Sequence, residues 1–415
     1  MKRTLFIAAA AVGITACGDS VAGPDGVDSD LVATCGGGFA DVYPCDGIDL
    51  WGHLPLGALD PGLQNATSLS DVWGWTDPVT GVEYALVARA NGVTFVDIST
   101  PRTPMPIARL ASPTPASNWR DLKTYADHVY IVADGAPTHG IQIFDLTRLR
   151  DLDEFTVVEE DGRYTGVSSA HNIAINEETG FAYSVGNNSG GDTCGGGLHM
   201  IDLADPKAPA FAGCFADLET GFGLTGYTHD VQCVVYRGPD ADHVGREVCI
   251  GANETAVVIS DVSDKANPVK LGVGTYPDFG YVHQGWLSED HRYYYQNDEA
   301  DEVAGHTELT RMLVWDVTDL DDPVLVKEHL GPSGAIDHNL YVHDGLIYHS
   351  NYTFGIRVLD ISDPADPMER ARFDTVPESD ATGFGGSWSN YPFFESGAIA
   401  VTSAREGLFI LRLRQ

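Results

Sequence analysis

Four histidines stand at equivalent positions in this sequence, each near the start of an apolar, strand-like segment. They occur in Ala170-His171-Asn172, Thr228-His229-Asp230, Val282-His283-Gln284 and Asp337-His338-Asn339. Imidazoles that converge from several strands can bind one divalent transition-metal ion, and zinc, copper, iron and manganese all accept such ligands. The pattern therefore indicates a candidate metal site made of these four histidines. Asp121 or Asp230 is expected as a further ligand or as a hydrogen-bond partner of one.

The same positions also have a structural explanation. Each repeat of a ring needs polar groups where its first strand begins, because these groups can bond the backbone of the neighbouring repeat. Histidine, asparagine and aspartate can do this around a water-filled channel without any ligand. Both interpretations stay open at this point.

Aromatic and polar residues beside the histidines suggest a second use of the same region. Four tryptophans lie in or next to the aligned segments and could stack against a sugar or an aromatic ligand, although packing between repeats also explains them. We expect ligand contacts from the following residues: Trp73, Trp119, Trp286, Trp388, Arg120, Asn172, Gln284 and Asn339.

Other chemistries find little support in the sequence. No nucleophile elbow, zinc-protease motif, phosphate-binding loop or dinucleotide fingerprint occurs in a suitable context. The acidic run 298–302 lacks the ligand spacing of an EF-hand, so we predict a solvated charge cluster there, with Ca²⁺ binding as the alternative. Seven further histidines are predicted to be surface or packing residues: His139, His199, His243, His291, His306, His343 and His349.

A repeated pattern shows what must position the histidines. An apolar strand, an aspartate, an aliphatic residue and a small or hydroxyl residue recur at intervals of about 45–60 residues, the length of one four-stranded propeller blade. The aspartates are Asp97, Asp145, Asp202, Asp261, Asp316 and Asp360. We predict that each accepts backbone N–H bonds in the turn after its strand, rather than acting as a catalytic acid.

The predicted fold class is all-β, a seven-bladed β-propeller. The end of the chain, 407–412, is a seventh copy of the pattern without its aspartate. Residues 48–54 form a lone strand-like segment near the other end. We predict that this N-terminal strand completes the seventh blade and closes the ring, which removes an exposed sheet edge.

The cysteines fall into local couples. Six cysteines follow Cys17, and an even number in an exported protein favours disulfides over metal thiolates. Pairing of neighbours is the simplest of several connectivities, and it gives Cys35–Cys45, Cys194–Cys214 and Cys233–Cys249.

The first residues predict export and a lipid anchor. Lys2 and Arg3 precede a short apolar run that is too short to span a bilayer permanently, and the run ends in Ile14-Thr15-Ala16-Cys17. These residues resemble the lipobox of bacterial lipoproteins. The expected organisation is a signal peptide at 1–16, a flexible tether at 17–34 lipidated at Cys17, and one propeller domain at 35–415.

Charge and location limit the partners. The formal net charge of −36 excludes a nucleic-acid partner, because phosphate binding needs clustered Lys and Arg. We expect contact with the membrane only through the lipid at Cys17, at the cell surface or outer membrane and facing the periplasm or the exterior. An extracellular protein, glycan or small ligand is the remaining class of partner.

The repeats also resemble a known family. Long matches carry the resemblance: 70–77, 119–121, 169–173, 226–230, 281–286, 336–340 and 391–394. They are similar to LVIVD repeats, and the chain from about Cys35 resembles the "choice-of-anchor B" surface proteins. This resemblance implies export, surface anchoring and a propeller-like fold, without a defined activity.

Two functions follow as hypotheses. In the first, the protein is a surface-anchored lipoprotein whose propeller acts as a binding or interaction module at the cell envelope. In the second, it is a metal-dependent oxidase or hydrolase that uses the channel histidines. The presence or absence of a bound metal separates the two.

Overall fold

The computed structural model describes residues 31–61 and 67–414. The predicted signal peptide, Cys17 and most of the predicted tether lie outside these residues. Within the described part of the chain, no helix is both long and apolar enough to cross a membrane.

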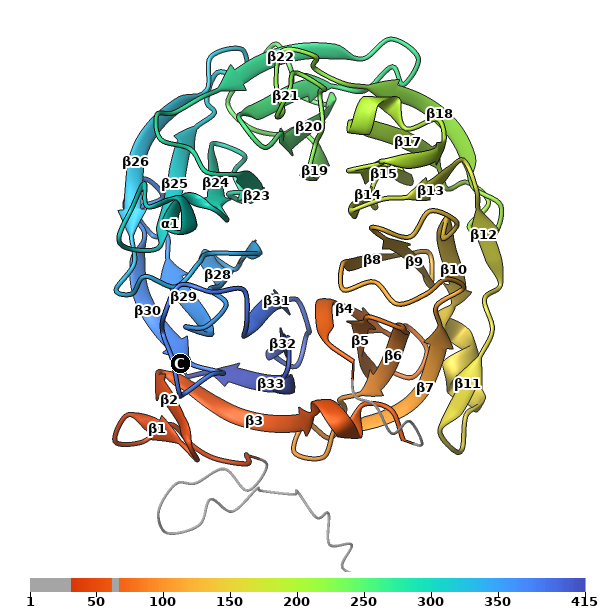
Figure 1. Ribbon diagram of the computed structural model, residues 1–415, viewed down its shortest axis with the longest axis vertical. Helices are drawn as coiled ribbons and strands as arrows, with labels where there is room; N and C mark the ends of the chain where they lie inside the picture. Colours follow the sequence, from red (N-terminus) through yellow and green to blue (C-terminus); the bar gives the residue numbers. More distant parts are fainter. Residues whose placement is uncertain (1–30, 62–66, 415) are drawn as a thin grey trace, which may run out of the picture.

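Seven antiparallel sheets surround a central channel, as the repeats predicted (Figure 1). The innermost strands of the blades are β4 (Leu69–Thr76), β8 (Arg120–Tyr125), β14 (Asn172–Asn176), β19 (Asp230–Val235), β23 (Val282–Leu287), β27 (Leu340–His343) and β31 (Ser387–Tyr391). The second strands are β5 (Glu83–Arg89), β9 (His128–Ala133), β15 (Phe181–Val185), β20 (Glu247–Ala252), β24 (Tyr293–Asp298), β28 (Leu346–Ser350) and β32 (Ala398–Ser403). The third strands are β6 (Gly92–Asp97), β10 (Ile141–Asp145), β17 (Leu198–Asp202), β21 (Val257–Asp261), β25 (Arg311–Asp316), β29 (Ile356–Asp360) and β33 (Gly407–Leu413). The outermost strands are β7 (Met105–Ala111), β12 (Gly162–Tyr164), β18 (Ala210–Phe215), β22 (Val269–Gly274), β26 (Val324–Leu330), β30 (Met368–Phe373) and β3 (Ile48–Pro55).

Short elements decorate the outer rim and the loops. β11 (Thr156–Val158) pairs in parallel with β7, and β13 (Val167–Ser169) pairs with β16 (Ser189–Gly191). The helical turns are η1 (Leu56–Ala58), η2 (Leu146–Asp151), η3 (Cys194–Gly196) and the single α-helix α1 (Asp301–Ala304) of the described residues.

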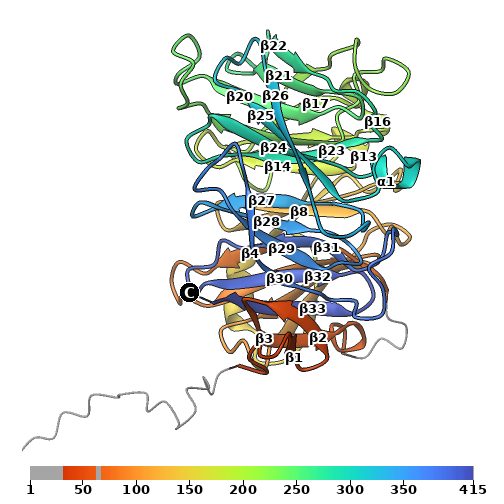
Figure 2. The ribbon, with the colours of Figure 1, turned by 90° about the vertical axis from the view of Figure 1, so that its left-hand side faces the viewer.

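The N-terminal strand closes the ring, as predicted. β3 lies antiparallel to β33, with Leu50 opposite Leu411 and Leu54 opposite Leu408, so the last blade joins a strand from near the N-terminus to the C-terminal strand (Figure 2). Upstream of β3, β1 (Phe39–Ala40) and β2 (Tyr43–Asp46) extend the sixth blade, where Cys45 pairs with Phe373. The Cys35–Cys45 disulfide therefore links the segment that precedes β3 to blade 6.

The repeated aspartates perform the structural role that was predicted. In all six copies, an Oδ1 atom accepts the backbone N–H of the residue two positions later. The bonds are Ser99 N to Asp97, Thr147 N to Asp145, Ala204 N to Asp202, Ser263 N to Asp261, Thr318 N to Asp316 and Ser362 N to Asp360. These turns return the third strand of each blade to its outer strand.

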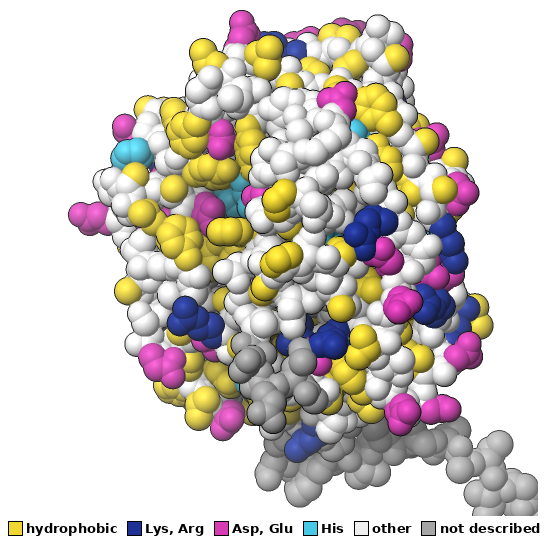
Figure 3. Space-filling model, turned by 45° about the vertical axis from the view of Figure 1, so that its right-hand side comes forward, with side chains coloured by type: hydrophobic (Ala, Val, Ile, Leu, Met, Phe, Trp, Pro, Cys, Tyr) yellow, Lys and Arg dark blue, Asp and Glu magenta, His cyan; other side chains and the backbone are white. Residues whose placement is uncertain are grey.

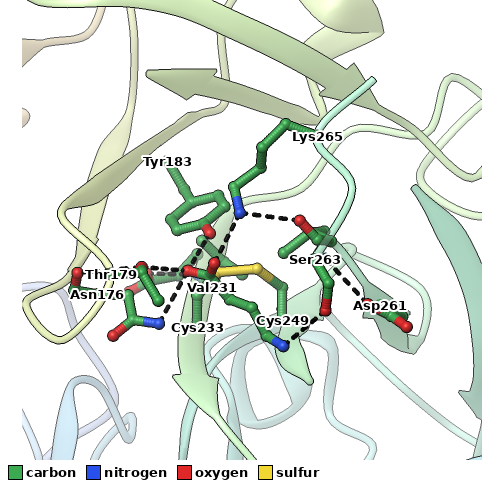
Figure 4. Close-up of a disulfide and its surroundings, with 12 residues drawn as sticks. Asn176, Thr179, Tyr183, Val231, Cys233, Cys249, Asp261, Ser263 and Lys265 are labelled. Carbon is green, nitrogen blue, oxygen red and sulfur yellow. Dashed lines mark hydrogen bonds and ion pairs between the residues drawn. A yellow bond between two sulfur atoms is a disulfide. The ribbon is translucent and has the colours of Figure 1, made fainter. Parts of the chain in front are cut away.

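All three predicted disulfides are present. Cys233 and Cys249 are directly opposed on β19 and β20, with Cα atoms 4.0 Å apart. Figure 4 shows this disulfide beside Tyr183 and Lys265. In the same region Glu247 accepts hydrogen bonds from Tyr183 of blade 3 and from Lys265, which links two blades outside the channel.

Apolar contacts between blades form the rest of the core. Phe95 of β6 stacks on Phe144 of β10 with ring centroids 5.0 Å apart, and both side chains are fully buried. At the junction of blades 1 and 7 the backbone of Gly74 lies against the ring of Tyr391, where an added Cβ would stand 2.0 Å from Cε1. Blades pack closely enough that glycine is needed at this crossing.

Candidate metal centre in the channel mouth

The four aligned histidines meet at one end of the channel. His171 and His229 directly precede β14 and β19, His283 lies in β23, and His338 stands just before β27. Because these inner strands run in the same direction, their starts share one mouth of the ring. Consecutive imidazole centroids are 4.2, 4.3 and 4.3 Å apart, so the rings form a continuous arc across four blades.

Hydrogen bonds at Nδ1 set the same tautomer in every ring. The four bonds join His171 Nδ1 to Asp134 Oδ2 (2.9 Å), His229 Nδ1 to the His283 carbonyl (2.9 Å), His283 Nδ1 to Asn297 Oδ1 (3.0 Å) and His338 Nδ1 to the Trp388 carbonyl. Each acceptor is an oxygen, so Nδ1 carries the proton and Nε2 carries the lone pair of the neutral ring. Metal-binding histidines are oriented in this way.

Glu299 completes the arc and was not foreseen in the sequence. It follows β24, which runs back to the mouth where β23 begins. Its Oε2 lies 3.6 Å from Nε2 of His283, and its Oε1 lies 3.5 Å from Nε2 of His338. Such ligand-to-ligand spacings suit an ion with bonds of about 2.1 Å. The position of Glu299 at the end of a second strand was the available signal, but it was read as part of a solvated acidic run.

The imidazoles are held neutral by their surroundings. Burial, together with the charge of a neighbouring imidazole, lowers the pKa of His283 and of His338 to about 3. Burial, followed by the charges of His171 and His283, lowers the pKa of His229 well below its ordinary value. At neutral pH all three present an unprotonated Nε2, which is the form that binds a metal.

A cavity of about 530 Å³ opens above the arc. Figure 3 shows histidine side chains inside a hollow bordered by hydrophobic and acidic side chains. The cavity is lined by the four histidines and Glu299, and its rim carries the exposed rings of Trp119 and Phe384. The site is therefore open on one side to molecules of moderate size.

Asp121 and Asp230, which were predicted to assist the histidines, lie near the buried Lys123 instead. Oδ1 of Asp121 bonds Lys123 Nζ at 2.5 Å, and Oδ2 accepts the backbone N–H of Ile173 at 2.7 Å. Lys123 also bonds Asp71 at 3.1 Å. Burial and then the charge of Asp121 raise the pKa of Asp230 to about 7. These side chains form a buried charge cluster deeper in the channel, and the carboxylate that meets the imidazole Nε2 atoms is Glu299.

The amides after the histidines bond neighbouring blades, as the structural explanation proposed. Asn172 donates to the His229 carbonyl, Gln284 to the Leu340 carbonyl and Asn339 to Ser389 Oγ. Arg120, at the aligned position of blade 2, is buried and donates to His139 Nε2 at 2.7 Å. The two interpretations thus apply to different atoms. The amides and each Nδ1 fasten blades or orient rings, while Nε2 is the atom of each neutral ring that a metal would bind.

The four tryptophans divide between two cavities. Trp119 and Trp388 line the histidine cavity, where Trp388 contacts His338 edge-on at 5.0 Å. Trp73 and Trp286 instead line a cavity of about 270 Å³ together with Lys123 and Tyr341. The four residues therefore border two cavities rather than one, because the inner strands carry them to different depths of the channel.

The acidic run is not a solvated cluster. Asp298 and Asp301 are fully buried, and Glu302 is 8% exposed. Asp298 accepts the hydroxyl of Tyr276 at 2.7 Å, while Asp301 pairs with Arg311 at 2.7 Å. Carboxylate oxygens of Asp301 and Glu302 lie within 4.8 Å of one from Asp337, which precedes β27 of the next blade, and sequence spacing alone did not reveal this inward turn.

Comparison with known proteins supports the fold. The LVIVD repeat profile matches residues 79–109 and 353–375, which lie in blades 1 and 6. No curated protein matches the chain in sequence.

Two solved structures are similar in shape. A Lactobacillus plantarum protein superposes with a TM-score of 0.52 at 14% identity, covering 80% of this chain and 87% of its own. The periplasmic gluconolactonase PpgL of Pseudomonas aeruginosa superposes with a TM-score of 0.50 at 11% identity, covering 77% of this chain and 92% of its own. At these identities the likeness concerns the fold alone.

Proposed function

We propose that this protein is a metal-binding β-propeller of the cell envelope, in which His283, His338 and Glu299 hold one transition-metal ion facing an open cavity. The observation that carries the proposal is the pair of contacts from Glu299 to the Nε2 atoms of both histidines, at 3.6 and 3.5 Å. His229 is the next imidazole along the arc and supplies a further nitrogen.

The donor set favours zinc or iron over harder ions. Two imidazoles and one carboxylate are the ligands of many zinc and non-haem iron sites that keep a position open for substrate. Such an ion supplies Lewis acidity to a bound group. The chain contributes the orientation of each ring through Nδ1, and Tyr352 fixes Glu299 by a 2.7 Å hydrogen bond.

The expected location follows from the sequence, with support from the disulfides. The segment before Cys17 has the layout of a lipoprotein signal, and three disulfides suit an oxidising compartment. Among the described residues, Ala33 pairs with Leu50 of β3, on the outer rim of blade 7. A lipid tether at Cys17 would therefore reach the ring at its rim and leave the channel mouth accessible.

Elemental analysis tests the metal site. The full chain, purified without a His-tag, is compared with a His283→Ala/His338→Ala variant and with a His306→Ala/His343→Ala control that removes two imidazoles outside the arc. We expect about one equivalent of zinc, iron, copper or manganese in the native chain and in the control, and its loss in the channel variant. A folded native chain that takes up none of these ions would overturn the proposal.

Ligand binding without a metal is the second candidate function. It is favoured by the rim of the histidine cavity, where Trp119 and Phe384 are 49% and 56% exposed. Exposed aromatic rings beside a cavity can stack on sugars or aromatic compounds. Tryptophan fluorescence of the metal-free chain, titrated with a panel of saccharides and aromatic acids, tests this role, and Trp119→Ala should abolish any response.

A further inference from the structure

A second group of acidic side chains lies next to the histidine arc, inside the protein. Asp301 and Glu302 come from α1, and Asp337 comes from the segment before β27. One carboxylate oxygen from each lies within 4.8 Å of the others, and all three side chains are buried. We call these three residues the carboxylate cluster.

The cluster lacks the donors that buried carboxylates need. Both oxygens of Asp337, both of Glu302 and Oδ1 of Asp301 have no hydrogen-bond partner among the described residues. The nearby cation is Arg311, whose Nε bonds the remaining oxygen of Asp301 at 2.7 Å. Burying a carboxylate without a donor or a counterion is costly, so this group needs protons or a cation.

A buried histidine from another strand points to the same place. His349 lies in β28 and is fully buried, and within the described part of the chain neither ring nitrogen has a hydrogen-bond partner. Its Nε2 is 3.7 Å from Oδ2 of Asp337. A fully buried imidazole from a second strand therefore faces Asp337 and the cluster.

The cluster holds more negative than positive charge. The groups that face the cluster are Asp298, Arg311 and His349, and they supply only one permanent positive charge against four carboxylates.

We propose that the carboxylate cluster binds a divalent cation of the calcium class, separate from the transition metal of the channel. Three carboxylates and no thiolate form a hard oxygen ligand set, which Ca²⁺ prefers over imidazole-rich sites. Backbone carbonyls and water complete such a coordination sphere. Nε2–H of His349 then faces Oδ2 of Asp337, and His349 is not a ligand of the ion.

The position of the cluster gives it a role in the channel site. Asp301 is two residues after Glu299, and Asp337 directly precedes His338. A cation bound by both Asp301 and Asp337 would hold in place the backbone next to Glu299 and to His338. This consequence rests on the proposed function, whereas the calcium site itself does not.

Calcium titration of the full chain tests the inference. The chain is stripped with EGTA, and CaCl₂ is then added while bound Ca²⁺ and the thermal unfolding midpoint are measured. We expect one Ca²⁺ per chain and a rise in Tm of a few degrees, because a ligand that binds only the folded state stabilises it. Asp337→Asn should lose both effects. Asp344→Asn, in an exposed acidic group formed with Glu289 and His343, should keep them.

The outcomes separate this site from the channel site. The stripped Asp337→Asn chain should unfold at or above the Tm of the stripped native chain, because the substitution relieves repulsion, so loss of binding is not mistaken for misfolding. His283→Ala/His338→Ala should still bind Ca²⁺ even if it loses its transition metal. Failure of the native chain to bind Ca²⁺ would show that protons neutralise the cluster, and preferential uptake of Zn²⁺ there would overturn the calcium assignment.

Discussion

The hydroxyl of Tyr352 donates to Oε1 of Glu299 across 2.7 Å, and it reaches there from a different blade. Tyr352 follows β28 in blade 6, whereas Glu299 follows β24 in blade 5. The ring of Tyr352 also lies 4.6 Å from that of His338. One side chain thus holds the carboxylate and contacts an imidazole of the same candidate centre.

Removing this hydroxyl should weaken metal binding without unfolding the protein. We expect Tyr352→Phe to lower zinc affinity by roughly 10–100-fold, because a partner that orients a ligand commonly contributes this much. A chelator competition titration measures the change. The matched control is Tyr295→Phe, which removes a hydroxyl bonded to the Pro364 carbonyl away from the arc. Equal affinities in all three chains would contradict the role given to Tyr352.

The ion pair between Asp77 and Arg150 should make the free energy of unfolding depend on pH in the acidic range. Arg150 donates two hydrogen bonds to Asp77, at 2.6 and 2.7 Å, and they lower the pKa of Asp77 below its ordinary value. A depressed native pKa stabilises the fold above the unfolded-state pKa of about 4, and this stabilisation is lost as the pH falls further. Asp77→Asn should therefore cost about 2 kcal/mol at pH 7 and progressively less below pH 4. Urea unfolding at several pH values measures the difference, and a pH-independent cost would contradict the assignment.

The contact between Gly74 and Tyr391 predicts a steric effect at the junction of the first and last blades. A Cβ at Gly74 would lie 2.0 Å from the tyrosine ring, so Gly74→Ala should destabilise the protein by about 1–3 kcal/mol. Gly57→Ala is the matched control, because no described atom lies within 4 Å of the added carbon. Denaturant unfolding of both variants checks the prediction. A neutral Gly74→Ala would mean that Tyr391 can move aside.

The buried side chain of Lys123 should stabilise the fold, because it pairs with the two buried carboxyl groups that it bonds. Lys123 bonds both Asp71 and Asp121, and its Nζ lies 4.4 Å from the ring centroid of Trp73. Lys123→Met should cost roughly 3–5 kcal/mol, because it leaves buried charges without a counterion. The double variant Asp121→Asn/Lys123→Met should recover part of that loss, because the pKa of Asp121 is lowered beside Lys123 despite its burial, whereas burial raises the pKa of Asp71. A double variant no more stable than the single one would contradict this account.

Local patterns in the sequence predicted the fold because the repeat encodes it directly. The aspartate of each copy sets a turn within two residues, as Asp97 does for Ser99, and this kind of contact can be read from a short segment. The closure of the ring by residues 48–54 could also be predicted, because the last repeat lacks one strand and the N-terminal segment has a strand without a blade. The disulfides followed for a similar reason, because each joins neighbouring cysteines.

The alignment of the repeats predicted the histidines of the site but not its other residues. The histidines share one register position, so their convergence follows from the ring. Glu299 directly follows the second strand of its blade, as Asp134 does in blade 2, and the alignment of first strands does not show that this position reaches the histidines. The pairing of His349 with Asp337 was missed for the same reason, because second strands and loops meet through the shape of the whole ring.

The pairing of β3 with β33 sets a condition on how the chain can be made. A ribosome releases Ile48–Pro55 first, but its partner Gly407–Leu413 is synthesised several hundred residues later. Until then, β3 has no strand with which to pair. Contacts between residues this far apart in sequence are slow to form. The ring can therefore close only after the chain has been synthesised as far as Leu413. A product truncated before Gly407 would keep an open blade that proteases can recognise.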